Sequence, residues 1–333
     1  MMSEVCREVK PVDFRELTYI IAVAEEHSVT EAAKRLYISQ PSLSYIISRT
    51  EKELGVKLFD RKTNPLSLTY AGEIYVERAR EILRIRDNMR RELADIGHGQ
   101  KGRINLGIPN ERAGYMLARV MPLFRQQYPG MEIKLQESRS PEIIRNLMSD
   151  KIGFCVLPGD KSNLPPGLCV EKIYEENLYV VAGKGYIPGD AVVKDDSSKD
   201  VYRMSAAGIP MRCVNLKKLK NTPFLIVKEG TFIRRKVEDI FREEGFFPRE
   251  IMELGNSISA VQMAGAGLGY TITPERAIVA LGGYDQFDCF LYSDRQDSWD
   301  VSAVYKEDVY LSQAERALID MMKEVFGGEP SVK

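Results

Sequence analysis

The sequence predicts a small, mostly helical N-terminal domain, then a long helix, then an α/β domain of two lobes. Capped helical segments occupy residues 13–55, an apolar repeat without proline runs over 69–96, and strand and helix patterns alternate after 103. A chain of 333 residues has room for two or three domains. The expected division is 13–70 for the first domain, 71–97 for the long helix, 103–178 with 296–328 for lobe 1, and 179–295 for lobe 2.

Three short helices are expected in the first domain. Asp13 is a good N-cap for a helix that buries Leu17 and its helical neighbours. Ser28 and Glu31 have the spacing of a capping box for the second helix. Ser39 would cap the third helix, with a proline just inside its start, and a glycine would end it at residue 55. The spacing therefore predicts a helix-turn-helix.

Two short strands, 58–59 and 66–69, are expected to follow around a basic turn at 61–65, which together would form a wing. Between residues 34 and 62, seven basic side chains stand against three acidic ones, a local balance of +4 in a chain of net charge −1. Contact with phosphate needs such a local basic face. The pattern favours DNA binding over its alternative, a plain three-helix bundle with a polar surface. The candidate DNA-binding residues are Thr30, Ser39, Gln40, Pro41, Ser42, Ser44, Tyr45, Arg49, Arg61 and Lys62.

The long helix carries an apolar seam. Ile82, Ile85, Met89 and Leu93 follow one another at spacings of three, four and four residues, which is typical of a coiled coil. We therefore expect these four residues to form a dimer interface. The alternative is a single helix packed on its own domain. The glycine-rich segment 97–102 should end the helix and act as a hinge.

The C-terminal region alternates between strands and helices. Such alternation predicts parallel sheets covered by helices, here in two lobes with a cleft between them. The last helix should return to the first lobe. The expected strands are 103–108, 131–136, 153–157, 178–182, 224–227, 251–254 and 269–272, and the expected helices are 113–128, 142–150, 232–244, 257–266 and 312–326.

Polar residues follow four of these strands. Open α/β sheets bind ligands beyond the carboxyl ends of their strands, and helix N-termini attract anionic groups. These positions therefore predict a ligand cleft, although a solvated loop or a helix cap is the alternative for each single residue. The candidate ligand-binding residues are Asn110, Glu111, Arg112, Ser138, Ser140, Lys228, Thr231 and Asn256.

Other features exclude several classes of protein. Five scattered cysteines without a C-x-x-C motif suggest reduced thiols in the cytoplasm. Two histidines make a histidine-rich metal or catalytic site improbable, and no Ser/His/Asp set is visible. No signal peptide and no membrane span are expected. The glycines of 265–269 follow a helix and precede a strand, the wrong order for a dinucleotide-binding turn. No enzyme activity, cofactor or metal is expected.

The N-terminal segment resembles the winged helix-turn-helix of the LysR-type transcriptional regulators. The matching stretches are Thr30–Leu36, Ser39–Ser44, Glu51–Arg61 and Leu68–Gly72, and a weaker likeness extends over almost the whole chain. Tyr45 departs from the family, which often has Arg there. The resemblance implies a linker helix that dimerises and a periplasmic-binding-protein-like effector domain.

A second departure concerns the effector cleft. The family often places small hydroxyl residues after the first two strands; Ser140 matches, but Glu111 does not. A carboxylate there argues against a simple dianionic effector. It suits a zwitterion or a cation, unless it is paired with Arg112 or Arg139.

The resemblance implies a sequence-specific transcriptional regulator. Its partners would be double-stranded operator or promoter DNA, a small-molecule effector, and further copies of itself in a homodimer or homotetramer, with RNA polymerase added if it is an activator; no membrane partner is implied. The alternatives are a solute-binding protein of transport type and an enzyme built on the two lobes.

Overall fold

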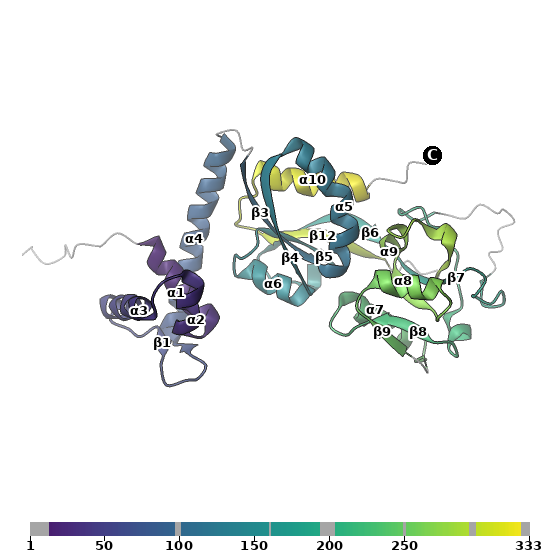
Figure 1. Cartoon of the computed structure of the whole chain (residues 1–333), viewed down its shortest axis with the longest axis horizontal. Coiled ribbons are helices and arrows are strands. Elements are labelled where there is room, and N and C mark those ends of the chain that lie inside the picture. Colours follow the sequence, from purple (N-terminus) through teal and green to yellow (C-terminus); the bar gives the residue numbers. More distant parts are fainter. Residues whose placement is uncertain are drawn as a thin grey trace, which may run out of the picture. The chain divides into compact units, whose positions relative to one another are not determined.

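The computed structural model describes residues 13–96, 101–159, 161–193, 204–248, 251–292 and 298–327 (Figure 1). The chain divides into two compact units, the first ending at Leu93 and the second beginning at Ala94. The first unit contains α1 (Phe14–Glu26), α2 (Val29–Leu36), α3 (Gln40–Leu54), β1 (Phe59–Asp60) and β2 (Ser67–Leu68), followed by most of α4 (Tyr70–Ile96), whose last three residues belong to the second unit.

The helices of the first unit begin at the predicted caps. The side chains of Asp13, Ser28 and Ser39 accept backbone N–H groups in the first turns of α1, α2 and α3. Gly55 ends α3 with φ +74°, a conformation that favours glycine. The helices bury Ile20, Ala32, Ala33, Leu43 and Ile47 in one core. The two alanines leave room for α3 to cross close to α2.

A buried carboxylate fixes the wing against α3. Glu51 is 2% exposed and accepts hydrogen bonds from the backbone N–H groups of Leu58, at 2.9 Å, and Phe59, at 3.3 Å. The Lys57 ammonium donates to its other oxygen at 2.7 Å. Gly72 completes the junction, because a Cβ there would lie 2.0 Å from the Leu58 carbonyl oxygen. The wing, α3 and the start of α4 are therefore locked together.

The first lobe of the second unit is built on a five-stranded sheet of order β4-β3-β5-β12-β6. Strand β3 is parallel to β4 and β5, whereas β12 is antiparallel to both β5 and β6. Its strands are β3 (Lys101–Pro109), β4 (Gly130–Ser138), β5 (Phe154–Pro158), β6 (Leu168–Glu176) and β12 (Trp299–Lys306), and its helices are α5 (Asn110–Gln127), α6 (Ser140–Met148) and α10 (Gln313–Gly327).

The second lobe contains two smaller sheets. Strand β7 lies between β10 and β11 and is antiparallel to both, while β8 and β9 form a parallel pair. The strands of this lobe are β7 (Leu178–Gly183), β8 (Phe224–Val227), β9 (Ile251–Leu254), β10 (Thr271–Pro274) and β11 (Phe287–Leu291). Its α-helices are α7 (Phe232–Glu243), α8 (Ser257–Gly265) and α9 (Glu275–Val279). Short 3-10 turns lie at Leu216–Leu219 and Tyr284–Gln286, and the first lobe has another at Lys161–Asn163.

The expectation of parallel sheets is confirmed only in part: β3 is parallel to β4 and β5, and β8 to β9, but β7 and β12 are antiparallel to their neighbours. The chain leaves the first lobe through β6 and returns through β12, which runs against its neighbours. Neither strand was predicted, because charged residues interrupt the apolar pattern of β6. The expected hinge at 97–102 is also wrong in part: residues 101 and 102 belong to β3, and 97–100 lie outside the described residues.

The return of the last helix to the first lobe is confirmed. Helix α10 packs against α5 and β6, and its Leu318, Ile319 and Met322 are buried in the core with Phe124 of α5. The predicted helix starts at 113 and 142 come too late. Asn110 and Ser140 already stand in the first turns of α5 and α6. The polar residues expected in strand-exit loops are therefore, in part, helix N-terminal residues.

Replacing Glu51 should loosen the wing. In Glu51→Gln the Lys57 ammonium and the two backbone donors lose their charged acceptor, so exchange of the Leu58 and Phe59 amides should accelerate roughly 5- to 150-fold, corresponding to about 1–3 kcal/mol. Hydrogen–deuterium exchange of peptides covering residues 55–60 measures this directly. Glu73→Gln, at an exposed position of α4, is the control and should leave the exchange unchanged.

The pH dependence gives a further check on the same variant. Burial opposes the charge of Glu51, but the hydrogen bonds from Lys57, Leu58 and Phe59 outweigh burial and hold its pKa below the ordinary value of 4.5. The stabilisation is therefore present above pH 4.5 and is lost as the pH falls. A variant as protected as the wild-type chain at neutral pH would contradict this role.

Candidate DNA interface and ligand cleft

The polar leading end of α3 is exposed. Gln40 donates from its amide nitrogen to the Ser44 hydroxyl at 3.0 Å, and the Ser39 and Ser42 hydroxyls lie 2.7 Å apart. Tyr45 is 67% exposed one turn further along. Pro41 and, on α2, Thr30 are exposed as well. These groups face solvent and are held by local hydrogen bonds only, so base edges and phosphates can replace their present partners.

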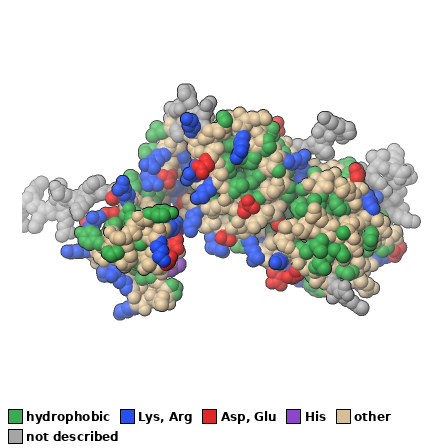
Figure 2. All heavy atoms as spheres, in the orientation of Figure 1, with side chains coloured by type: hydrophobic (Ala, Val, Ile, Leu, Met, Phe, Trp, Pro, Cys, Tyr) green, Lys and Arg blue, Asp and Glu red, His purple; other side chains and the backbone are tan. Residues whose placement is uncertain are grey.

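The predicted basic residues differ in how they are held. Arg61 and Lys62 stand exposed in the turn between β1 and β2, where the Arg61 guanidinium donates to the Ser48 hydroxyl at 3.2 Å. Arg49 instead forms an ion pair with Glu16 of α1. Figure 2 shows Lys and Arg side chains along the edge of the first unit that carries α3 and the wing. The basic face is therefore present, but the Arg49 charge is shared with an internal partner.

The apolar row of α4 lies on the surface of the described chain. The exposed fractions of Ile82, Ile85, Met89 and Leu93 range from 39% to 68%. Arginines and glutamates occupy many of the other positions of the helix. Four large apolar side chains at coiled-coil spacing are a surface that a second helix can cover.

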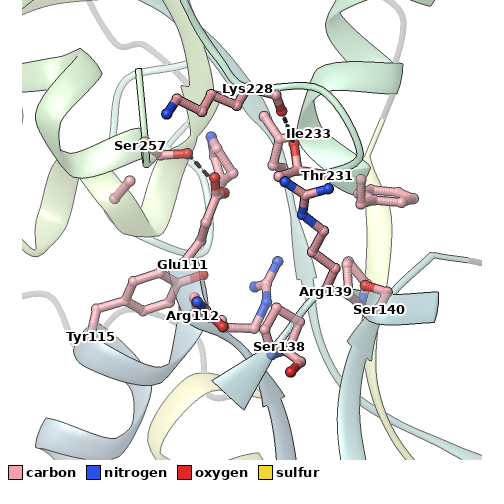
Figure 3. Close-up of a pocket in the computed structure, with 17 residues that line it drawn as sticks. Glu111, Arg112, Tyr115, Ser138, Arg139, Ser140, Lys228, Thr231, Ile233 and Ser257 are labelled. Carbon is pink, nitrogen blue, oxygen red and sulfur yellow. Dashed lines mark hydrogen bonds between the residues drawn. The ribbon is translucent and has the colours of Figure 1, made fainter. Parts of the chain in front are cut away.

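Seven of the eight candidate ligand residues line one cavity between the two lobes. Its volume is about 190 Å³, and it is also lined by Tyr115, Arg139, Phe232, Ile233 and Ser257 (Figure 3). Helices α5, α6, α7 and α8 all begin at this cavity. The exception is Asn256, whose side chain accepts the Ser259 N–H at 2.8 Å and thereby caps α8.

The charge of Arg112 is already neutralised. Its guanidinium is 4% exposed, donates to Glu176 at 2.9 Å and also hydrogen-bonds the Tyr174 hydroxyl. Glu176 ends β6 and is fully buried. The possible pairing of Glu111 with Arg112 is therefore not found. Arg112 lines the cavity mainly as a structural ion pair.

Glu111 has its hydrogen-bond partner in the opposite lobe. The Ser257 hydroxyl, at the start of α8, donates to one carboxylate oxygen at 3.0 Å. The other oxygen is buried and has no hydrogen-bond partner. Burial raises the pKa of Glu111, only partly offset by the Ser257 hydrogen bond and the Arg112 charge. The acid expected from the sequence is thus a cavity group that lacks one partner.

Arg139 and Ser257 are cavity residues that the candidate set omitted. Arg139 is the N-cap residue of α6, and its guanidinium lies against Gly230 of the other lobe, where an added Cβ would come within 2.6 Å of it. Both omitted residues directly neighbour candidates, at the strand exit 137–140 and beside Asn256. Sequence spacing identified the correct segments but could not choose between adjacent side chains.

Within the described ranges, no helix is both long and apolar enough to cross a membrane. Nor do those ranges hold a group of three or more His, Cys, Asp or Glu side chains suited to binding a metal ion.

A winged helix-turn-helix followed by a two-lobed domain with an interlobe cavity defines a ligand-responsive DNA-binding regulator. Residues 14–73 match the family model described as bacterial regulatory helix-turn-helix protein, lysR family, and residues 97–327 match the LysR substrate binding domain. The chain belongs to the LysR family of transcriptional regulators.

Known proteins of similar sequence carry both parts. An uncharacterised HTH-type transcriptional regulator of Bacillus subtilis, YcgK, is 26% identical over 321 residues, 94% of each chain. A probable RuBisCO transcriptional regulator of Phaeodactylum tricornutum is 29% identical over 258 residues, 76% of this chain and 77% of that protein. Full-length OxyR from Pseudomonas aeruginosa, in a variant form, has the same fold with a TM-score of 0.66 at 21% identity, covering 97% of this chain and 99% of that one. A regulator is therefore favoured over a transport-type binding protein or an enzyme.

A buried acid lies where the chain passes between the lobes. Glu275, at the start of α9, accepts the Asn177 N–H at 3.3 Å, and its own N–H donates to the Asn177 carbonyl at 3.0 Å. Asn177 joins β6 to β7. Burial, together with the nearby Glu176 charge, raises the pKa of Glu275 to about 7.

Glu275 should make the second unit less stable as the pH rises. The pKa of Glu275 in the folded chain lies above its ordinary value of 4.5, so the folded chain holds this proton more tightly than the unfolded chain does. The free energy of unfolding should therefore decline as the pH rises from about 4.5 to about 7. The upper limit of this decline is about 3 kcal/mol. Urea unfolding followed by the fluorescence of Trp299, the one tryptophan, measures it. Glu275→Gln should flatten the profile, whereas Glu324→Gln, exposed on α10, should not. Equal pH profiles for Glu275→Gln and the wild-type chain would refute the assignment.

Proposed function

We propose that this protein is a cytoplasmic, homo-oligomeric regulator that recognises an operator through α3 and the wing. A small effector in the interlobe cavity changes its placement on DNA. Two features of the same chain support the proposal. The first is the exposed polar start of α3 beside the basic wing, and the second is a ligand-sized cavity that contacts between the two lobes bridge. The proposed division of the chain keeps residues 13–70, 71–97, 103–178 with 296–328, and 179–295.

The start of α3 is the part that recognises the bases. A major groove admits an α-helix, and amide and hydroxyl groups at its leading end reach base edges. We assign base contacts to Gln40, Ser42, Ser44 and Tyr45, and phosphate contacts to Arg61 and Lys62 of the wing. Because Arg49 is paired with Glu16, its contribution is to hold α3 on α1 as well as to add positive charge.

Pairing of two chains through α4 supports this recognition. A two-fold dimer places two recognition helices on successive major-groove faces. The apolar row of α4 supplies a surface for that pairing, whereas Val76 and Ala79, earlier in the helix, are buried. If the protein activates transcription, RNA polymerase is a further partner.

The cavity supplies the means of regulation. An effector shifts the protein between arrangements only through different affinity for each of them. Glu111 and Arg139, from the first lobe, both reach residues of the second. A ligand that binds these two side chains therefore favours one relative placement of the lobes.

Loss of the Gln40 amide should reduce sequence discrimination. We expect Gln40→Ala to weaken binding to the cognate operator about 5- to 150-fold, since a lost bidentate base contact costs about 1–3 kcal/mol of discrimination. Binding to random-sequence DNA should change little. Gel-shift titrations with both duplexes test this, with Gln127→Ala, at an exposed position in the effector domain, as the control. An equal loss on both duplexes would make Gln40 a phosphate-contacting or structural residue.

A charge in the α4 seam should prevent dimerisation. Met89→Lys would place an ammonium group in the apolar interface, which is costly without a partner. Sedimentation velocity should then show monomers and operator binding should be lost, while both lobes remain folded. Arg90→Ala, at the neighbouring exposed position, should remain dimeric. A Met89→Lys dimer of unchanged affinity would remove this seam from the interface.

A further inference from the structure

The cavity presents an acid and a base on opposite sides. Figure 3 shows the Glu111 carboxylate, from the start of α5, on one side and the Arg139 guanidinium, from the start of α6, on the other. Both side chains extend from the first lobe toward the second. They form no ion pair with each other, because Glu111 is bonded to Ser257 and the Arg139 side chain lies over Gly230. Opposite charges that do not meet leave a gap that a ligand can bridge.

The acidic side lacks a hydrogen-bond donor. One oxygen of Glu111 is buried with no partner, although buried polar atoms in proteins are nearly always hydrogen-bonded. The positive charge that acts on Glu111, that of Arg112, is already committed to Glu176 and Tyr174. Burial raises the pKa of Glu111, so the groups around it compensate its charged form poorly. A ligand that donates hydrogen bonds and carries positive charge would satisfy this group.

The basic side suits an anion. Arg139 has an exposed guanidinium whose fork geometry matches a carboxylate. The N-termini of α6 and α7 reach the cavity at Ser140 and Thr231, and helix N-termini favour negative groups. Lys228, also exposed, lines the cavity too, but Figure 3 shows its side chain extending toward Ser257 and away from Arg139. A neutral or purely cationic ligand would leave all of these groups unused.

We propose that the effector is a free amino acid or a closely related amino carboxylate, with its ammonium group on Glu111 and its carboxylate on Arg139. This inference rests on the proposed function and specifies its ligand. A dicarboxylate would place a second negative group beside the buried Glu111. The cavity volume of about 190 Å³ is below the 300–1,000 Å³ common for drug-sized ligands, so the molecule is small. Phe232, Ile233 and Ala277 offer an apolar wall for its side chain.

The same two contacts explain how such a ligand would act. Glu111 bonds to Ser257 across the cleft, and Arg139 crosses it to reach Gly230. An amino carboxylate bound to both first-lobe side chains would also meet the second-lobe residues that they touch. Its binding energy would then depend on the distance between the lobes, as regulation requires.

The test is a binding screen with the full-length protein. The protein amino acids and simple β- and γ-amino acids are added at millimolar concentration, and the melting temperature is recorded. For each compound that raises it, the deaminated carboxylic acid, the decarboxylated amine and succinate are compared by calorimetric titration. We expect at least one amino carboxylate to bind, and its acid and amine analogues to bind at least about ten-fold more weakly.

Matched variants assign the two ends of the ligand. Glu111→Gln should weaken binding of the amino carboxylate about ten-fold or more but leave binding of its deaminated acid nearly unchanged. Arg139→Gln should also weaken binding of the amino carboxylate about ten-fold or more, but leave binding of the decarboxylated amine nearly unchanged. Glu142→Gln and Arg145→Gln, exposed on α6 and outside the cavity lining, are the controls and should bind as the wild-type chain does.

Three results would overturn the inference: no amino carboxylate raises the melting temperature, succinate or the amine binds at least as tightly, or Glu111→Gln leaves the affinity unchanged. Specific DNA binding is measured separately on the ligand-free chain. Its loss would refute the proposed function, whereas its presence with any of these three results would refute only the ligand class.

Discussion

The buried ion pair between Arg112 and Glu176 anchors the first-lobe side of the cavity. It joins the first turn of α5 to the last residue of β6, where the chain leaves the first lobe. Breaking a buried pair leaves an uncompensated charge, which is strongly destabilising, so the two elements are fixed relative to each other. Because Arg112 is held in this way, the neighbouring Glu111 reaches across the cleft to Ser257. The chemical character of the cavity follows from a charge pair at its floor.

The first unit uses a buried carboxylate for a related purpose. Glu51 accepts hydrogen bonds from the Leu58 and Phe59 N–H groups and from the Lys57 ammonium, and so holds the wing at a fixed place beside α3. A DNA-binding domain needs its recognition helix and wing at fixed positions relative to each other, so that both contact the DNA at once. The polar groups at the start of α3 face solvent and are held only by local hydrogen bonds. The buried Glu51 contacts therefore fix the domain, while the residues proposed to contact bases lie on its surface.

Local features of the sequence predicted much of this structure. The caps at Asp13, Ser28 and Ser39 were predictable because a cap depends on residues within one turn. Strands β6 and β12 were not, because their charged residues are accommodated by neighbours distant in sequence. The pairing of Glu111 with Ser257 joins residues 146 positions apart, so no spacing rule could find it. The early starts of α5 and α6 were not predictable, because polar residues such as those at 110–112 and 140 are equally typical of loops that follow a strand.

Sequence-specific recognition by paired helices is tested most directly by selecting bound duplexes from a random pool with the full-length protein. The predicted result is enrichment of one sequence made of two related half-sites, with their centres about one helical turn, or a multiple of it, apart. Enrichment of no sequence above the starting pool, or of a single isolated half-site, would contradict recognition by a two-fold dimer.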